Sequence, residues 1–250
     1  MVFCVIGISE VAKRIHPKVA GVLMGLPFGA GISAYFFAYE QGADFAMETV
    51  PWSITGLVST LIFALAYLWA GQRYRALPRV PGVAVASTVS VAAWGVSTFL
   101  LRQVPMNLFG AACLFAFSVA GNLRLLKKFP SQGSKTSDKA SSLDAILFRA
   151  LAAGVTISVI TGFAGMMGPS WSGLLGPFPV LMLPLLLVLH FEDGEKVYPG
   201  VVHAYARSVT NLFLFYLGLY VLLPRVGLNA TFLVLYPLSG LYLWALGRRG

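Results

Sequence analysis

The sequence predicts an all-α polytopic membrane protein with about nine transmembrane helices, arranged as two inverted four-helix repeats joined by a connector helix (4+1+4). Three observations carry this prediction: the composition, a series of long apolar segments, and an internal repeat. Of the 250 residues, 58% are hydrophobic and 11% are charged. Soluble domains carry about 25% charged and about 45–50% apolar residues. The composition therefore excludes a disordered chain and disfavours a soluble enzyme.

Nine apolar segments, separated by short charged or Pro/Gly-containing breaks, define the expected spans. They cover residues 1–12, 19–39, 49–70, 80–101, 105–126, 146–167, 171–191, 199–223 and 227–247. The segments are continuously apolar and do not alternate with period 2, as the strands of a membrane barrel do. Because helices satisfy their own backbone hydrogen bonds in lipid, a helical bundle is expected.

The basic residues fall mainly on one side of this topology. The odd-numbered connections and the C-terminal tail hold 15 of the 18 basic residues, the even-numbered connections hold Arg102 and Arg225, and Arg207 lies within a span. Cytoplasmic connections carry the excess of Lys and Arg. We therefore expect a multi-pass inner (plasma) membrane protein with its N-terminus outside and its C-terminus in the cytoplasm. Its partners are then membrane lipids rather than nucleic acid, and its oligomeric state stays open.

The two halves of the chain align without a gap at an offset of 152 residues. The matched residues are mostly Gly, Pro and Glu: Pro17 with Pro169, Gly21 with Gly173, Pro27 with Pro179, Glu40 with Glu192, and Gly42 with Gly194. Chance similarity between apolar segments would favour Leu and Val instead. Because an odd number of spans separates equivalent positions, the second unit is expected to be inverted.

The repeat divides the chain into four parts. Residues 1–101 form repeat unit one (helices 1–4), residues 102–126 the connector helix 5, and residues 146–250 repeat unit two (helices 6–9). Residues 127–145, which are rich in Ser and Lys, form a cytoplasmic polar linker. Inverted repeats recur in secondary transporters, whose binding site lies near the membrane midplane at the repeat interface.

Two helix breaks form the first candidate binding site. Segments 21–31 and 173–179, which are rich in Gly and Pro, open the second and seventh spans at equivalent positions. Proline kinks a helix, and matching breaks in both halves indicate a transporter site. The helix N-termini beyond the breaks would present positive dipole ends to an anion. Close helix packing is the alternative. The candidate residues are Pro27, Gly29, Pro177 and Pro179.

A polar stripe on the eighth span is the second candidate. His203, Arg207 and Asn211 share one helix face, and the same register in the first half contains Thr55 and Ser59. A charge within a span usually faces the bundle interior or a cavity, so Arg207 is expected to bind an anionic group. The alternative is that Arg207 extends to the membrane surface.

Three residues are candidates for proton coupling: Glu40, Glu192 and His190. A desolvated carboxylate at a membrane edge can relay protons, whereas a solvated one in a turn has no such role.

Other polar and aromatic residues have structural explanations. Asn107 and Asn122 are expected to bond between helices. Most of the aromatic residues near the predicted span ends are expected to form an aromatic belt; they are Trp52, Tyr67, Trp69, Tyr74, Trp171, Tyr198, Tyr220 and Tyr242.

No metal site, cofactor or catalytic residue is expected. Cys4 and Cys113 lack paired spacing, the three histidines lack metal-binding spacing, and the sequence has no nucleotide-binding loop. No nucleophile–base pair occurs at a plausible spacing, so the chain is not expected to be an enzyme.

Three short motifs resemble the small GlpM-type inner-membrane proteins, which are four-helix chains. They are Val19–Pro27, Trp171–Pro179 and Ala93–Ser97. The resemblance implies a fused, inverted duplication of such a unit, and a link to exopolysaccharide production, with no catalytic residues. The functional expectation is a secondary transporter or flippase for a small or lipid-linked anionic solute, working by alternating access. A non-transporting module that supports envelope or exopolysaccharide assembly is the alternative, and a channel is the third.

Overall fold

The computed structural model describes residues 22–129, 164–193 and 197–248, and within these ranges all secondary structure is helical. Three helices are short: α3 (Phe28–Gln41), α8 (Ala164–Leu175) and α9 (Met182–Asp193). Five are long and apolar enough to cross a membrane: α4 (Ala43–Arg73), α5 (Arg79–Arg102), α6 (Leu108–Leu126), α10 (Tyr198–Val226) and α11 (Leu228–Arg248). The all-helical prediction is confirmed, and these five helices are those expected of a multi-pass membrane protein.

The predicted count of nine spans in a 4+1+4 arrangement is not what the described residues show, because they form eight helices. The expected span 171–191 is two helices, α8 and α9. Pro177 and Pro179 lie between them, and proline lacks the amide hydrogen that a continuing helix needs. The expected span 19–39 becomes α3 only at Phe28, directly after Pro27. The expected span 1–12, most of 146–167 and most of the linker lie outside the described residues.

Helix α4 forms the centre of the bundle. Its most apolar window is 78% buried, against 22% for α5 and 17% for α6. It packs against α3, α5, α6, α8 and α10. Asn122 of α6 donates to the Leu61 carbonyl of α4 at 3.1 Å, which confirms the expected bond between helices. Asn107 instead caps α6, accepting from the Gly110 amide at 2.7 Å, so that expectation was wrong.

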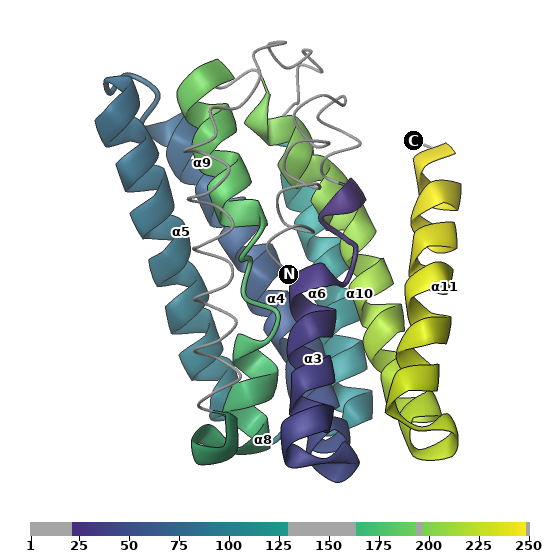
Figure 1. Cartoon of the computed structure of the whole chain (residues 1–250). Helices are drawn as coiled ribbons and strands as arrows, with labels where there is room; N and C mark the ends of the chain where they lie inside the picture. Colours follow the sequence, from purple (N-terminus) through teal and green to yellow (C-terminus); the bar gives the residue numbers. More distant parts are fainter. Residues whose placement is uncertain (1–21, 130–163, 194–196, 249–250) are drawn as a thin grey trace.

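Equivalent helices of the two halves run in opposite directions. At the offset of 152 residues, α3, α4 and α5 correspond to α9, α10 and α11. Figure 1 shows α3 and α5 descending where α9 and α11 ascend, and α4 ascending where α10 descends. Helices α3 and α4 meet at Gly42, whose φ of 95° requires a glycine.

The two ends of the bundle differ in charge. The end at which α4, α6, α9 and α11 finish, called the basic end here, is uppermost in Figure 1. Seven basic residues of the described ranges lie there: Arg73, Arg75, Arg79, Arg124, Lys127, Lys128 and Arg248. The opposite end holds Glu40, Asp44, Glu48, Arg102 and Arg225. Basic residues therefore gather at one end of the folded helices.

Candidate functional site

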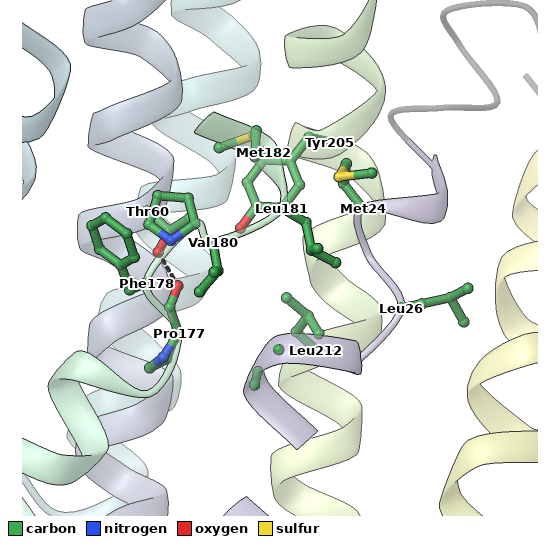
Figure 2. Close-up of a pocket in the computed structure, with 13 residues that line it drawn as sticks. Met24, Leu26, Thr60, Pro177, Phe178, Val180, Leu181, Met182, Tyr205 and Leu212 are labelled. Atoms are coloured by element: carbon green, nitrogen blue, oxygen red, sulfur yellow. Dashed lines mark hydrogen bonds between the residues drawn. The ribbon is translucent and has the colours of Figure 1, made fainter. Parts of the chain in front are cut away.

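A cavity of about 40 Å³ lies where the two helix breaks face each other (Figure 2). Both halves line it: Met24, Leu26, Gly29, Ala30 and Thr60 come from the first, and residues 177–182, Tyr205 and Leu212 from the second. A buried water needs at least about 10–15 Å³ of such volume, whereas drug-sized ligands occupy pockets of about 300–1,000 Å³. The cavity therefore fits a few water-sized groups or a small ion.

Each break is hydrogen-bonded to the long helix of the other half. Asn211 of α10 donates to the Gly25 carbonyl at 2.9 Å. Thr60 of α4 donates to the Pro177 carbonyl at 2.9 Å, the bond drawn as a dashed line in Figure 2. Gly25 and Pro177 occupy equivalent positions at the offset of 152. A helix break leaves backbone carbonyls without helical partners, and burial requires that they find others. The two bonds, called the carbonyl clamps here, meet this requirement reciprocally.

The breaks also press against the backbone of the long helices. A Cβ atom at Gly25 would lie 2.6 Å from both the Cβ and the carbonyl oxygen of Ser208 on α10. A Cβ atom at Gly56 on α4 would lie 2.7 Å from the Leu174 carbonyl oxygen. Gly56 and Ser208 are equivalent in the repeat. Small residues therefore permit a close approach to the long helix of the opposite half at both breaks: Gly25 lies within the first, and Gly56 faces the last turn of α8 directly before the second, with Pro177 Cγ 3.1 Å from its added Cβ.

Two helix N-termini border the cavity. The first turn of α3 contributes Gly29 and Ala30 to the lining, and the first residue of α9 contributes Met182. Pro27 precedes α3 without a side-chain cap, and neither helix has an acidic residue in its first turn. The positive ends of both helices are therefore left without a compensating carboxylate. The polar side chains in the described lining are Thr60 and Tyr205. Figure 2 shows Tyr205 reaching from α10 toward the second break, which is the one between α8 and α9.

The predicted polar stripe does not converge on the cavity. Asn211 forms a carbonyl clamp, but Arg207 is exposed on α10, and His203 donates from Nε2 to the Phe129 carbonyl at 2.6 Å. In the first half, Thr55 donates to Pro51 within its own helix. The Ser59 hydroxyl is buried and has no hydrogen-bond partner among the described residues.

The predicted helix breaks, by contrast, do meet. Gly29, Pro177 and Pro179 all line the cavity. Pro27 lies beside it as the residue before α3, and its carbonyl accepts from the Tyr236 hydroxyl at 3.3 Å.

Of the proton-coupling candidates, His190 and Glu192 lie in the last turn of α9, and Glu40 lies at the other end of the bundle. Glu40 is exposed at the end opposite the basic end, and Glu192 lies in the last turn of α9, with a side chain outside the described part of the structure. His190 lies with Nδ1 3.2 Å from the Tyr67 hydroxyl.

Tyr67 and Tyr198 are fully buried, so the aromatic-belt assignment was wrong for both. Trp69 and Tyr74 are exposed, as that assignment requires.

The two polar lining residues, Thr60 and Tyr205, were missed in the sequence. Thr60 follows the predicted Ser59 directly, but it aligns with Leu212 in the repeat, so the alignment marks no matched polar pair. Tyr205 lies between two stripe residues, His203 and Arg207, and faces the cavity that Arg207 does not reach. For both residues, the signal available in the sequence was their closeness to residues of the predicted polar stripe.

Arg207→Gln is expected to change the free energy of unfolding by less than about 0.5 kcal/mol, because surface substitutions away from packed features are nearly neutral. The side chain is exposed and does not line the cavity. Equilibrium unfolding in mixed micelles measures the effect. A loss of several kcal/mol would show that Arg207 has a structural partner.

Comparison of the chain with protein-family models, with curated proteins and with solved structures gives no match, so the function is argued from the geometry.

Proposed function

We propose that the chain is an inner-membrane secondary transporter for a small anionic solute, working by alternating access between two inverted repeats. One observation carries the proposal. Two helix breaks at equivalent positions face one cavity, and each is clamped by the long helix of the opposite half. Broken helices at a repeat interface are where transporters of this architecture bind their solute.

The lengths of the broken helices support a transport site over simple packing. Helix α3 has 14 residues and α9 has 12, so they extend about 21 Å and about 18 Å. Neither crosses a hydrocarbon core of about 30 Å alone. Non-helical backbone at that depth is tolerated only where protein buries it or where it lines a cavity. The breaks at 24–27 and 176–181 meet both conditions.

The reciprocal clamps support alternating access. Because the breaks and the long helices are related by the repeat, two arrangements of similar energy are expected, each the inverted counterpart of the other. Transport then follows from movement of one repeat against the other around a fixed site. The close approaches of Gly25 to Ser208 and of Gly56 to Leu174 are the surfaces at which this movement takes place.

The lining favours a small anion. The positive ends of α3 and α9 border the cavity. None of the described lining residues carries a carboxylate that would hold a cation. A volume of about 40 Å³ favours a small solute over a lipid-linked one.

Flux into proteoliposomes tests the proposal. The parent chain is expected to take up at least one of a panel of labelled small anions, such as chloride, nitrate, formate and phosphate. Gly29 lines the cavity, and its nearest contact for an added Cβ is 3.9 Å away. Gly29→Leu should therefore fold, fill the cavity, and lower flux at least tenfold.

Gly240→Leu is the matched control, because Gly240 is exposed on α11 with no atom within 4 Å of an added Cβ. It should retain parental flux. The proposal fails if the parent moves none of these anions, or if Gly29→Leu transports as fast as the parent.

A further inference from the structure

A histidine is packed between two buried tyrosines at the basic end of the bundle. The Tyr67 hydroxyl of α4 lies 3.2 Å from Nδ1 of His190 on α9. The His190 ring is 4.5 Å from the Tyr198 ring of α10, centroid to centroid. Both tyrosines are 0% exposed, and His190 is half-buried. One side chain from each of three helices therefore forms this cluster, called the His190 cluster here.

The cluster is tightly held. The two tyrosine rings are 5.7 Å apart at 81°, an edge-to-face arrangement. A side chain at Gly71 would collide with the Tyr198 hydroxyl, and its Cβ would lie 3.3 Å from Cε1 of His190. The glycine at this position therefore makes room for the histidine and the tyrosine together.

The fold itself does not require polar groups here. At the offset of 152 residues, the other half places Ala38 where His190 lies, Ala46 where Tyr198 lies, and Leu219 where Tyr67 lies. All three are apolar and buried. At these three equivalent positions the helices therefore pack without a titratable side chain, and the polar cluster breaks the symmetry of the repeat.

The helices around the cluster carry charged residues of their own. Helices α4, α5 and α10 pack against α9 or contribute to the cluster. Their exposed charged residues are Asp44, Glu48, Arg73, Arg79, Arg207 and Arg225, and Arg102 is half-buried at the opposite end. On α9 itself, Glu192 and Asp193 follow in the last turn. Helix α5 also places the neutral hydroxyl of Ser87 beside Tyr67.

We propose that the His190 cluster binds a proton and that this proton is the coupling ion of the proposed transport, on which this inference rests. With the ring hydrogen on Nε2, neutral His190 accepts a hydrogen bond from Tyr67 at Nδ1. A proton that enters from the basic end bonds to Nδ1, and imidazole becomes imidazolium. Both ring nitrogens then donate, so Tyr67 must accept and turn its own hydrogen away.

This change reaches the cavity through one short helix. Helix α9 carries His190 near its end and Met182, a cavity residue, at its start, and its 12 residues span about 18 Å. A rearrangement of the contact between α9 and α4 at the basic end therefore shifts the start of α9, which borders the second break. Binding a proton on one side biases which arrangement of the repeats is populated.

Nuclear magnetic resonance of the full chain in nanodiscs tests proton binding without any solute. The ring nitrogens of histidine are labelled with ¹⁵N, and His190→Gln identifies the His190 signals. Between about pH 5 and pH 8, where histidine titrates, those signals should shift. Tyr67→Phe, which removes the phenol that binds Nδ1, should move the midpoint. Absence of titration, or an unchanged midpoint in Tyr67→Phe, would overturn the proposal.

A second readout follows the conformation. Spin labels at the exposed positions Arg73 and Phe191, in a chain without Cys4 and Cys113, report the distance between α4 and α9. This distance should change over the same pH range in the parent but not in His190→Gln, whose amide still accepts from Tyr67. A response that persists in His190→Gln would contradict the proposal. Anion flux without titration refutes the proton as coupling ion but not transport. Titration without flux of any anion refutes transport, and coupling with it, but not proton binding by the cluster.

Discussion

Adding one methyl group at Gly25 or Gly56 is expected to destabilise the bundle by about 1–3 kcal/mol, the usual cost of overpacking. In Gly25→Ala the new Cβ would lie 2.6 Å from the Ser208 carbonyl oxygen, and in Gly56→Ala 2.7 Å from the Leu174 carbonyl oxygen. Because these contacts are with backbone atoms, a side-chain rotation cannot relieve them. Equilibrium unfolding in mixed micelles measures the loss. Because the two contacts are similarly short, the two variants should lose similar amounts of stability.

Gly95→Ala and Gly121→Ala are the matched controls. Both glycines lie within helices, and an added Cβ at either has no atom within 4 Å. Alanine favours a helix over glycine by about 1 kcal/mol, so these variants should be neutral or more stable than the parent. If Gly56→Ala were as stable as Gly95→Ala, the break would not press against α4 as described.

Removing a carbonyl clamp is expected to be the second large effect. Thr60→Val keeps the shape of the side chain but removes the donor to the Pro177 carbonyl, and Asn211→Leu removes the donor to the Gly25 carbonyl. A buried carbonyl left without a partner costs about 1–3 kcal/mol. Each variant should lose stability by that amount in the same unfolding assay. Each should also lose anion flux, because the break it leaves free no longer holds its position beside the cavity.

Thr55→Val separates this effect from the loss of any threonine hydroxyl. Thr55 lies on the same helix, but its hydroxyl donates within α4, to the carbonyl of Pro51 four residues earlier. Thr55→Val should therefore lose less stability than Thr60→Val and keep parental flux. Equal losses in the two variants would mean that the bond across the halves has no special role.

The positions of the breaks could be predicted from the sequence because they depend on local backbone chemistry. Pro177 and Pro179 cannot continue a helix, and their match with Gly25 and Pro27 at the same offset predicts the corresponding break in the first half. The long helices α4, α5, α6, α10 and α11 followed from their apolar length. These signals lie within one segment of chain and need no knowledge of packing.

The lining residues could not be predicted in the same way, because helical spacing gives a shared face but not the direction of that face. Arg207 and Asn211 lie one turn apart, yet Arg207 is exposed while Asn211 is buried against the first break. Similarly, Tyr67 and Trp69 both lie near a span end. Only the packing of α9 and α10 against α4 shows that Tyr67 belongs to the His190 cluster and Trp69 to the surface.

Alternating access requires that the cavity between the breaks opens to each side of the membrane in turn, and the accessibility of a cysteine in the cavity detects this. Ala30 lines the cavity and is 8% exposed. Ala30→Cys, in a chain whose Cys4 and Cys113 are replaced by serine, is treated with a membrane-impermeant thiol reagent from either side of oriented vesicles. Tyr39→Cys, at an exposed position of α3 beside one end of the bundle, is the control and should react from one side only. Alternating access predicts that Ala30→Cys reacts from both sides, and that labelling from one side blocks the other. Labelling from one side only, under all conditions, would contradict it.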